Sequence, residues 1–474
     1  MIFNSFQFVW LFPLIFVLYW GCSRLWPGRR AGDVAKYFLL AVSYGLYAQW
    51  SVPYTLILFG VTLVTFFFAL LIERRKAFGR KKYIIWAGVS LTLFPLLVFK
   101  YFNFITGAGA SVLQWIGIDA APPALEWVVP LGLSFYTFQA LGYLWDVYYA
   151  KIKAERNFGD YMLFVAFFPQ ILCGPISRPD ELLPQIKSPR EFDYTRAVSG
   201  LKYLLWGMFL KVVLADRLGI YVDTIYAEPL KYSGSSSLLA SICYSLQIYG
   251  DFAGYSFMAL GVARLLGFDI IKNFNRPYLA TSVSAFWKRW NISLTRWLTT
   301  YIYIPLGGSR CGKLRTYRNI MLTFLVSGIW HGANWTFIFW GVIHGAAQCV
   351  EKFLGWNMAP RGKWSVLPRI LFTFVIVNFA WIFFRLPTIG EGWEVIRHIF
   401  SSPAAPYIHP TTFFHLAVAV PIVVAADVMR EFTPGILAGL NRYTVVRWSA
   451  YVILLTLILT FGVLDSGQFI YVSF

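Results

Sequence analysis

The chain has 474 residues, of which 58% are hydrophobic and 13% are charged, and its mean hydropathy is +0.59. This composition excludes an ordinary soluble globular protein, because its apolar surface exceeds what one soluble core can bury. The net charge of +19 is typical of nucleic-acid-binding proteins, but here the basic residues lie in short loops between apolar runs. We therefore interpret the charge as a signal of membrane topology and expect no nucleic-acid partner.

Long apolar runs recur along almost the whole chain, at the roughly 17 to 25 residues that a bilayer-crossing helix needs. The runs are continuous, which excludes an outer-membrane barrel with its alternating segments of about ten residues. We predict an all-α polytopic membrane protein with about eleven spans, forming a single membrane domain over residues 1–474. The first five spans are predicted at residues 8–22, 36–50, 53–72, 84–106 and 128–149.

The loops between these spans alternate in charge. Arg24–Arg30, Glu73–Lys82 and Lys151–Arg156 are basic, whereas Gly107–Trp127 has no Lys or Arg. Because basic loops stay on the cytoplasmic side, the pattern predicts a multi-pass protein of the cytoplasmic membrane with its N-terminus outside. The N-terminal segment lacks a basic region and a cleavage site, so we expect a retained span. The five scattered cysteines predict neither a disulfide framework nor a metal site.

Two segments interrupt the pattern of spans. Residues 161–186 are too apolar for a loop yet rich in Pro and Gly, which favours a re-entrant or surface-lying element. Residues 273–318 mix Trp, Arg and Lys with apolar residues, which favours amphipathic helices at the cytoplasmic face. Further spans are predicted at residues 320–350, 367–385, 411–426 and 447–464.

The best candidate for chemistry is His331, which lies inside a long apolar run between Gly328 and Gly332. An ionisable group at membrane depth is a functional hypothesis, and histidine is the side chain best suited to act as a general base near neutral pH. The flanking glycines would let another backbone approach closely. The alternative is a histidine that joins two helices by a hydrogen bond and has no catalytic role.

Other ionisable residues are weaker candidates. His344 would lie roughly 20 Å from His331 along a straight helix, on another face, so it has a supporting or a structural role. Asp251 lies within an apolar run, where a buried pair with Arg264 or another helix competes with a substrate contact. The remaining histidines are read as solvated, namely His398, His409 and His415.

The segment around residues 288–297 combines basic, aromatic and amide side chains. On one helix Arg289 and Arg296 would share a face and could meet phosphates, either of a nucleotide-like cofactor or of lipid headgroups. Asn291 could donate a hydrogen bond to a developing oxyanion, although this signal is weak without further support.

The residues then show a family resemblance. FWKRWNISLTRW, YIPLGGSR and SGIWHGANWTFIFWGVIHG occur in this order, after SFYTFQALGYLWDVY and QIYGDFAGYSFMALGVARLLGF. Together they resemble the signature of the membrane-bound O-acyltransferase (MBOAT) family, in its bacterial alginate O-acetyltransferase branch. The resemblance covers residues 1–350, with a motif core at 128–350. The C-terminal spans, at about 367–464, lie outside the matched region.

The resemblance implies a ring of helices around a thinned centre that houses the family's histidine, matched here by His331. It also implies acetyl-CoA as the acyl donor, entering from the cytoplasm, and acetylation of a secreted polysaccharide with the help of a periplasmic SGNH-hydrolase-like partner. A polysaccharide synthesis and export complex and membrane lipids are the other expected partners, and no metal is expected. We predict His331 and Asn291 as the catalytic residues. The predicted donor-binding residues are Lys288, Arg289, Trp290 and Arg296, and the predicted supporting residues are His344, Asp251, Trp330 and Asn334.

The chain departs from that branch at a few positions. It has Asn291 where the branch has histidine, Phe257 in place of an acid, and Thr299 and Thr300 in place of an Arg-Asp pair. These departures put alginate itself in doubt and leave cellulose, another exopolysaccharide or peptidoglycan open as the acceptor. Two rival functions are a transporter of polysaccharide or lipid-linked sugar without acyl chemistry, and D-alanyl transfer to teichoic acid within the same family.

Overall fold

The computed structural model describes residues 3–25, 29–75, 78–119, 121–358, 362–464 and 470, and within these residues it contains helices and no strand. The predicted all-α class is confirmed. Two of the predicted basic loops, Arg24–Arg30 and Glu73–Lys82, lie partly outside the described residues. The chain divides into two compact units, unit 1 with Met1–Gly200 and Ala259–Ile271, and unit 2 with Leu201–Met258 and Lys272–Phe474. Our expectation of one membrane domain stays a prediction.

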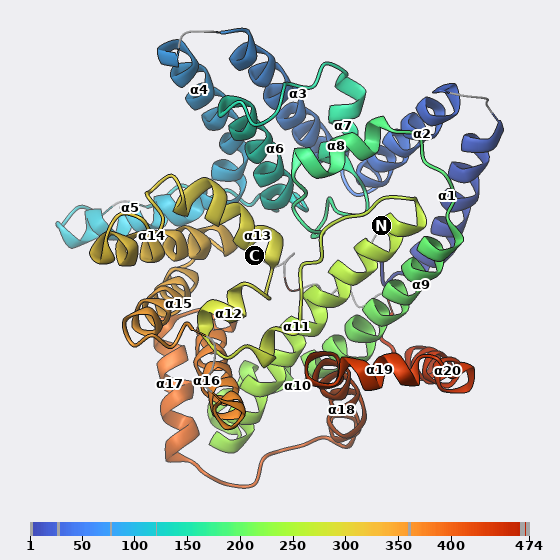
Figure 1. Ribbon diagram of the computed structural model, residues 1–474. Coiled ribbons are helices and arrows are strands. Elements are labelled where there is room, and N and C mark those ends of the chain that lie inside the picture. The colour runs from blue at the N-terminus through green and yellow to red at the C-terminus, as the bar shows by residue number, and fades with distance from the viewer. Residues whose placement is uncertain are drawn as a thin grey trace. The chain divides into compact units, whose positions relative to one another are not determined.

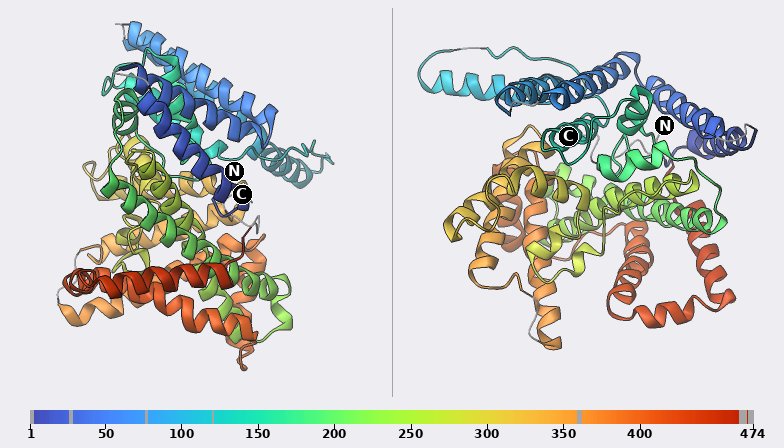
Figure 2. Two further views of the ribbon diagram at one scale, coloured as in Figure 1. Left: turned by 90° about the vertical axis from the view of Figure 1, so that its right-hand side faces the viewer. Right: turned by 45° about the horizontal axis from the view of Figure 1, so that its top comes forward.

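Unit 1 is built from the N-terminal helices, coloured blue to green in Figure 1. They are α1 (Phe6–Leu25), α2 (Arg29–Ala48), α3 (Val52–Arg74), α4 (Phe78–Leu96), the π-helix η1 (Leu97–Tyr101), α5 (Phe102–Trp115), α6 (Leu133–Tyr148), α7 (Phe158–Ala166) and α8 (Pro179–Lys187). Two of the three unit boundaries fall inside helices, namely α9 (Tyr194–Met208) and α11 (Gly234–Leu265). Within unit 1, α1 packs beside α2 and α3 packs against α4 and α6 (Figures 1 and 2).

Unit 2 holds the remaining helices. They are the π-helix η2 (Phe209–Ala215), α10 (Asp216–Ala227), η3 (Pro229–Lys231), η4 (Pro277–Leu279), α12 (Val283–Trp287), α13 (Ile292–Leu298), the π-helix η5 (Thr299–Tyr303), α14 (Lys313–His331), α15 (Trp335–Phe353), η6 (Lys363–Ser365), α16 (Val366–Arg385), α17 (Ile389–Ser401), α18 (Pro410–Phe432), α19 (Pro434–Leu440) and α20 (Thr444–Phe461). The short α19 joins α18 to α20, and both of these long helices contact η2 (Figure 2).

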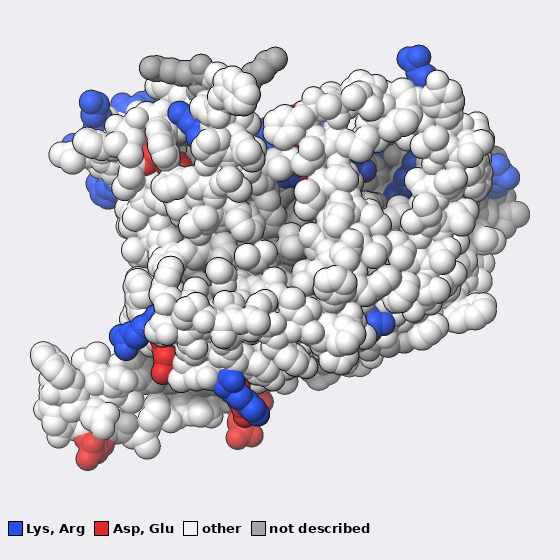
Figure 3. Space-filling model, turned by 90° about the horizontal axis from the view of Figure 1, so that it is seen from below, with Lys and Arg blue, Asp and Glu red and all other residues white. Residues whose placement is uncertain are grey.

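Seven helical stretches among the described residues are long and apolar enough to cross a membrane. They are Phe6–Arg24, Val52–Arg74, Gly79–Trp115, Tyr194–Ala227, Val366–Arg385, Pro410–Phe432 and Thr444–Phe461. Six of them coincide with spans predicted from the sequence. The predicted second span is also helical, but α2 begins at Arg29 and carries Asp33 and Lys36 in its first turns. Most of the face in Figure 3 carries no charge, and the large apolar side chains of Trp10 and Leu459 are exposed. A surface that faces lipid is apolar, so both observations agree with a membrane protein.

The predicted fifth span begins later than expected, at Leu133. Gly132 precedes it with a left-handed backbone (φ 72°), and a Cβ at this position would lie 2.1 Å from the carbonyl oxygen of Ile171. Only glycine fits such a site, because it lacks the Cβ and tolerates positive φ. Gly132 thus allows the chain to turn against residues 167–174 before α6 starts.

The first predicted interruption is buried inside unit 1. Between α7 and α8 the backbone forms turns, and nearly all residues from 161 to 177 are buried. Ser177 donates to Gln170, Gln170 donates to Gln139, and the Gln139 amide donates to the carbonyl of Phe164. Irregular backbone at membrane depth persists only where protein covers it and satisfies its polar groups. The segment is therefore a buried part of unit 1, and whether it is re-entrant or lies at the membrane surface stays a prediction.

Candidate active site

The candidate site in unit 2 is built on two helices that meet at His331. We predicted one long span over residues 320–350, and this is wrong: α14 ends at His331 and α15 begins at Trp335. Gly332 adopts an extended backbone (φ −167°, ψ 156°), and the Asn334 side chain accepts a hydrogen bond from the Thr336 N–H at 3.1 Å. Gly332 thus ends α14 as its C-cap, and Asn334 starts α15 as its N-cap.

Glycines hold α14 and α15 at close range. A Cβ on Gly328 would lie 2.4 Å from the carbonyl oxygen of Phe337, and a Cβ on Gly341 would lie 2.4 Å from that of Phe324. Real Cβ atoms cannot approach backbone this closely, so both positions require glycine. The prediction that Gly328 lets another backbone approach is confirmed.

His331 is almost completely buried, at 3% exposure. Its Nδ1 lies 2.6 Å from the carbonyl oxygen of Ser327. A carbonyl can only accept, so Nδ1 carries the proton and Nε2 is the nitrogen with a lone pair. The rings of Trp330 and Trp340 pack edge-on against the imidazole, with centroids 4.9 and 4.7 Å away. The site thus fixes both the orientation and the tautomer of His331.

His344 contacts the same indole as His331. Its ring centroid lies 4.9 Å from Trp340, and Trp287 of α12 donates its N–H to His344 Nδ1 at 3.2 Å. We expected a straight helix that separates the two histidines by about 20 Å, and this is wrong. The turn after His331 folds α15 back along α14, so both imidazoles face one aromatic cluster.

A cavity of about 320 Å³ adjoins this cluster. Its apolar wall includes Trp287, Leu298 and Phe324, and Ser327, whose carbonyl holds His331, also lines it. Two lysines, Lys288 and Lys352, line it as well. A concave site with apolar walls and a few charged groups is typical of a small-molecule binding site.

Glu351 fixes one wall of the cavity in place. It lies at 4% exposure near the end of α15, and its carboxylate accepts hydrogen bonds from the backbone N–H groups of Val283 and Ser284, the latter at 3.0 Å. These groups begin α12, which carries Trp287 and Lys288. A carboxylate on the first N–H groups of a helix satisfies donors that have no partner within the helix.

The comparison with known proteins identifies the family. The model of the membrane-bound O-acyltransferase family matches residues 150–386. The chain is 36% identical over 408 residues to the probable alginate O-acetylase AlgI of Pseudomonas aeruginosa, covering 85% of this chain and 75% of that protein. The chain belongs to the membrane-bound O-acyltransferase family. It is therefore a multi-pass membrane protein and an acyltransferase.

Two other MBOAT relatives show the range of the similarity. The peptidoglycan O-acetyltransferase of Helicobacter pylori is 34% identical over 392 residues, covering 76% of this chain and 73% of that protein. The teichoic acid D-alanyltransferase of Streptococcus thermophilus is 27% identical over 339 residues, covering 66% of this chain and 78% of that protein. Because the family is one of acyltransferases, the transporter alternative is not supported.

The MBOAT segment around Asn291 differs from the predicted amphipathic helix. Asn291 has a left-handed backbone (φ 42°) and separates α12 from α13. Our prediction that Arg289 and Arg296 share one helix face is therefore wrong. Arg289 is instead paired with Glu431 of α18 at 2.9 Å. A left-handed residue ends a right-handed helix, and Asn is among the few residues that tolerate this conformation.

Asn291 itself is 1% exposed, and neither atom of its side-chain amide has a hydrogen-bond partner among the described residues. Burial of an unsatisfied amide is costly, so such a group in a native structure calls for an explanation, such as a bound ligand. The adjacent Trp290 is completely buried against Phe286 and Trp381. It contributes to the aromatic core and does not line the cavity.

The remaining predicted site residues have structural contacts. Asp251 of α11 pairs with Lys211 of η2 at 2.6 Å, so its partner is on another helix, and the alternative pairing with Arg264 is wrong. Lys211 also pairs with Asp216 at 2.7 Å. Asn334 donates to the Pro387 carbonyl at 2.9 Å in addition to capping α15.

The other histidines lie away from the cavity, and one expectation about them is wrong. His415 is buried at 3% exposure in α18, packed against Phe461 with ring centroids 6.0 Å apart, because α18 turns this face toward α20. His409 is exposed, as predicted. His398 is half-buried and its Nε2 lies 2.8 Å from the Tyr232 carbonyl oxygen.

Sequence reasoning missed Trp287, Ser327, Trp340, Glu351 and Lys352. Ser327 and Trp340 lie four residues before and nine residues after His331, so a search of the turns around His331 on both sides could have found them. Glu351 could also have been recognised as a candidate, because an acidic residue directly after an apolar run indicates a functional or structural role.

Proposed function

We propose that this acyltransferase takes acetyl groups from acetyl-CoA and supplies them for O-acetylation of a secreted polysaccharide, with His331 as the general base. The acetyl specificity is supported by the relatives named alginate O-acetylase and peptidoglycan O-acetyltransferase, which match at 34–36% identity. The D-alanyltransferases match at 27% and 24% identity. The acetyl donor is therefore the better supported of the two acyl donors.

The observation that carries the proposal is the hydrogen bond between His331 Nδ1 and the Ser327 carbonyl, because Ser327 also lines the cavity. This bond assigns the lone pair to Nε2. In the proposed reaction Nε2 accepts the proton of an acceptor hydroxyl while its oxygen attacks the thioester carbonyl. The tetrahedral intermediate then collapses, the C–S bond breaks, and the imidazolium returns the proton to the departing thiolate.

The intermediate carries a negative oxygen that needs a donor. Asn291 is the proposed donor, because its buried amide has no hydrogen-bond partner among the described residues. A preorganised neutral donor stabilises charge that develops in the transition state without reorganising at that moment. The left-handed backbone of Asn291 costs conformational energy, and strained residues of this kind cluster at functional sites.

The donor-binding residues are proposed to be the two lysines of the cavity, Lys288 and Lys352. Acetyl-CoA carries phosphates on its nucleotide, and lysine binds phosphate as a point charge. Arg296 of α13 is retained as a third basic residue for this role, whereas Arg289 is occupied by Glu431. Trp290 is packed in the aromatic core, so its proposed contribution is to hold the shape of the site and not to contact the donor.

The cellular setting is proposed from topology and resemblance. In this proposal acetyl-CoA and the lysines lie on the cytoplasmic side of a bacterial inner membrane and the N-terminus lies in the periplasm, which the basic loops of the sequence support. The acetyl group then passes to a periplasmic SGNH-hydrolase-like partner of a polysaccharide export complex. Alginate, cellulose, another exopolysaccharide and peptidoglycan are the candidate acceptors.

The test uses inside-out membrane vesicles that contain the full chain and its native glycan machinery. With acetyl-labelled acetyl-CoA outside, we expect alkali-labile label to appear in the polymer, and Lys288→Ala and Lys352→Ala to raise the KM for the donor. Lys231→Ala is the matched control, since Lys231 is 67% exposed and far along the chain from the cavity residues. Labelling from a D-alanyl carrier protein, with none from acetyl-CoA, would refute the proposed donor.

A further inference from the structure

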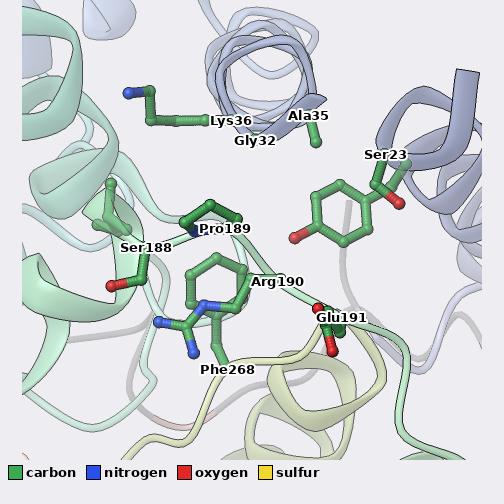
Figure 4. Close-up of a pocket in the computed structure, with 11 residues that line it drawn as sticks. Ser23, Gly32, Ala35, Lys36, Ser188, Pro189, Arg190, Glu191 and Phe268 are labelled. Carbon is green, nitrogen blue, oxygen red and sulfur yellow. The ribbon is translucent and has the colours of Figure 1, made fainter. Parts of the chain in front are cut away.

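A second cavity, of about 370 Å³, lies inside unit 1. It is enclosed by the end of α1, the start of α2 and the segment from Ile186 to Glu191 (Figure 4). The side chains that give it chemical character are Tyr19, Ser23, Lys36, Arg190, Glu191 and Phe268. None of these residues takes part in the acyl-transfer site described above.

The cavity lies where a membrane span ends. The first candidate span runs from Phe6 to Arg24 and α2 begins at Arg29, so Tyr19 and Ser23 belong to the last turns of that span. Chain segments at the end of a span lie at the level of the lipid headgroups. The basic residues that follow α1 assign this end to the cytoplasmic leaflet, which carries anionic lipids.

Arg190 supplies a positive charge, and Asp269 is the acidic side chain that acts on it electrostatically without forming an ion pair. It is half-buried, and its Nε and Nη2 both donate to the carbonyl of Gln185, with the Nε distance at 2.8 Å. Its guanidinium lies beside the ring of Phe268 (Figure 4), at 5.1 Å from the ring centre. No acidic side chain of the described residues forms an ion pair with it. A guanidinium held in this way keeps Nη1 for a ligand.

Tyr19 supplies a second donor. Its side chain is 2% exposed and lines the cavity, and its hydroxyl has no hydrogen-bond partner among the described residues. Lys36, by contrast, is already neutralised by Asp33 at 2.9 Å and Asp160 at 2.7 Å. The free donors of the cavity are therefore one cation and one phenol, which together suit a single anionic oxygen group.

We propose that this cavity binds the phosphodiester of an anionic phospholipid, with Arg190 and Tyr19 as the donors. A diester carries one negative charge, which can pair with the guanidinium of Arg190, the cation of the cavity that has no ion pair among the described residues. Glu191 lines the exposed side of the cavity, and its carboxylate disfavours a doubly charged phosphate monoester by repulsion. The position at headgroup level brings lipid to the site without a separate delivery step.

The test measures lipid binding by the full-length protein in detergent micelles, using native mass spectrometry and the thermal unfolding midpoint. Phosphatidylglycerol is the probe, with phosphatidylcholine and inorganic phosphate as comparison ligands. The variants are Arg190→Gln and Tyr19→Phe. Arg196→Gln is the matched control, because Arg196 is a neighbouring half-buried arginine that does not line the cavity.

We expect Arg190→Gln to weaken phosphatidylglycerol binding about tenfold, since a hydrogen bond to a charged group is lost. Tyr19→Phe should weaken binding by a smaller factor, and because it keeps the ring it tests the site even if Arg190→Gln unfolds. Arg196→Gln should bind as the unmodified protein does. Equal binding by all variants, equal loss in the control, or equal binding of phosphatidylcholine would overturn the proposal. A rise of the unfolding midpoint with inorganic phosphate but not with phosphatidylglycerol would show that the site binds a free anion, and would overturn the proposal of a lipid ligand.

Discussion

The indole N–H of Trp287 donates to Nδ1 of His344 at 3.2 Å, which places the proton of that imidazole on Nε2. His331 has the opposite tautomer, because its Nδ1 donates to the Ser327 carbonyl. Both rings contact Trp340. One imidazole thus offers a basic nitrogen and the other offers an N–H, which agrees with the proposed roles of His331 as the base and of His344 as a positioning residue.

Replacement of Trp287 by phenylalanine tests that assignment. Trp287→Phe keeps an aromatic ring in the cavity wall but removes the N–H that fixes the His344 tautomer. Loss of one hydrogen bond should lower the acetyl-transfer rate roughly three- to tenfold, measured in membrane vesicles at saturating donor. Trp115→Phe, at a residue 86% exposed in unit 1, is the control. A rate unchanged by Trp287→Phe would show that the tautomer of His344 has no role.

Glu351 should act through α12 and not through the chemical step. Glu351→Ala leaves the N–H groups of Val283 and Ser284 without their acceptor, which typically costs about 1–2 kcal/mol. Because α12 carries Trp287 and Lys288, we expect a higher KM for the donor with a smaller change in kcat. Glu351→Gln retains an acceptor oxygen and should restore part of the affinity. A loss of kcat alone, identical in both variants, would contradict this role.

The contact between α14 and α15 should tolerate no side chain at Gly328. Gly328→Ala forces the helices apart at the Phe337 carbonyl, and overpacking of this kind costs about 1–3 kcal/mol. We expect a lower unfolding midpoint in detergent. Gly435→Ala is the matched control, since a Cβ there meets nothing within 4 Å and alanine favours the helix. Equal midpoints for the two variants would argue against the close packing.

Glu155, in the loop between α6 and α7, should make stability depend on acid pH. Burial raises the pKa of its carboxyl, but N–H donors from Asn157 and Arg156 and the Lys187 ammonium together hold that pKa below its ordinary value. The stabilisation is present above about pH 4.3, the ordinary value of a glutamate. It is lost as the pH falls through the lower pKa of the folded protein.

The measurement is the unfolding midpoint in detergent from pH 7 to pH 3.5. The unmodified protein should lose more stability over the acid range than Glu155→Gln, whose amide does not titrate. Glu228→Gln removes an exposed ion pair with Lys231 and should follow the unmodified protein. Parallel curves for the unmodified protein and Glu155→Gln would rule out this contribution.

Most spans were predictable because each is a local apolar run of sufficient length. The end of α14 was not, since Gly occurs commonly within membrane helices and Gly332 alone does not signal a break. The turn at Asn291 had a usable signal, because Asn tolerates a left-handed backbone. The contact of Glu351 with Val283 joins residues 68 positions apart, and no local pattern predicts such a pairing. His331 was predicted from the sequence, whereas the hydrogen bond between its Nδ1 and the Ser327 carbonyl is seen only in the structure.

The most direct test of the central claim is the acetyl ester content of the secreted polysaccharide in cells that carry His331→Ala. Protein level, membrane insertion and polymer export are measured alongside, and His409→Ala serves as control because His409 is exposed. The account predicts that His331→Ala abolishes the esters while export and protein level stay normal. Unchanged ester content with His331→Ala would contradict acyl transfer through this residue.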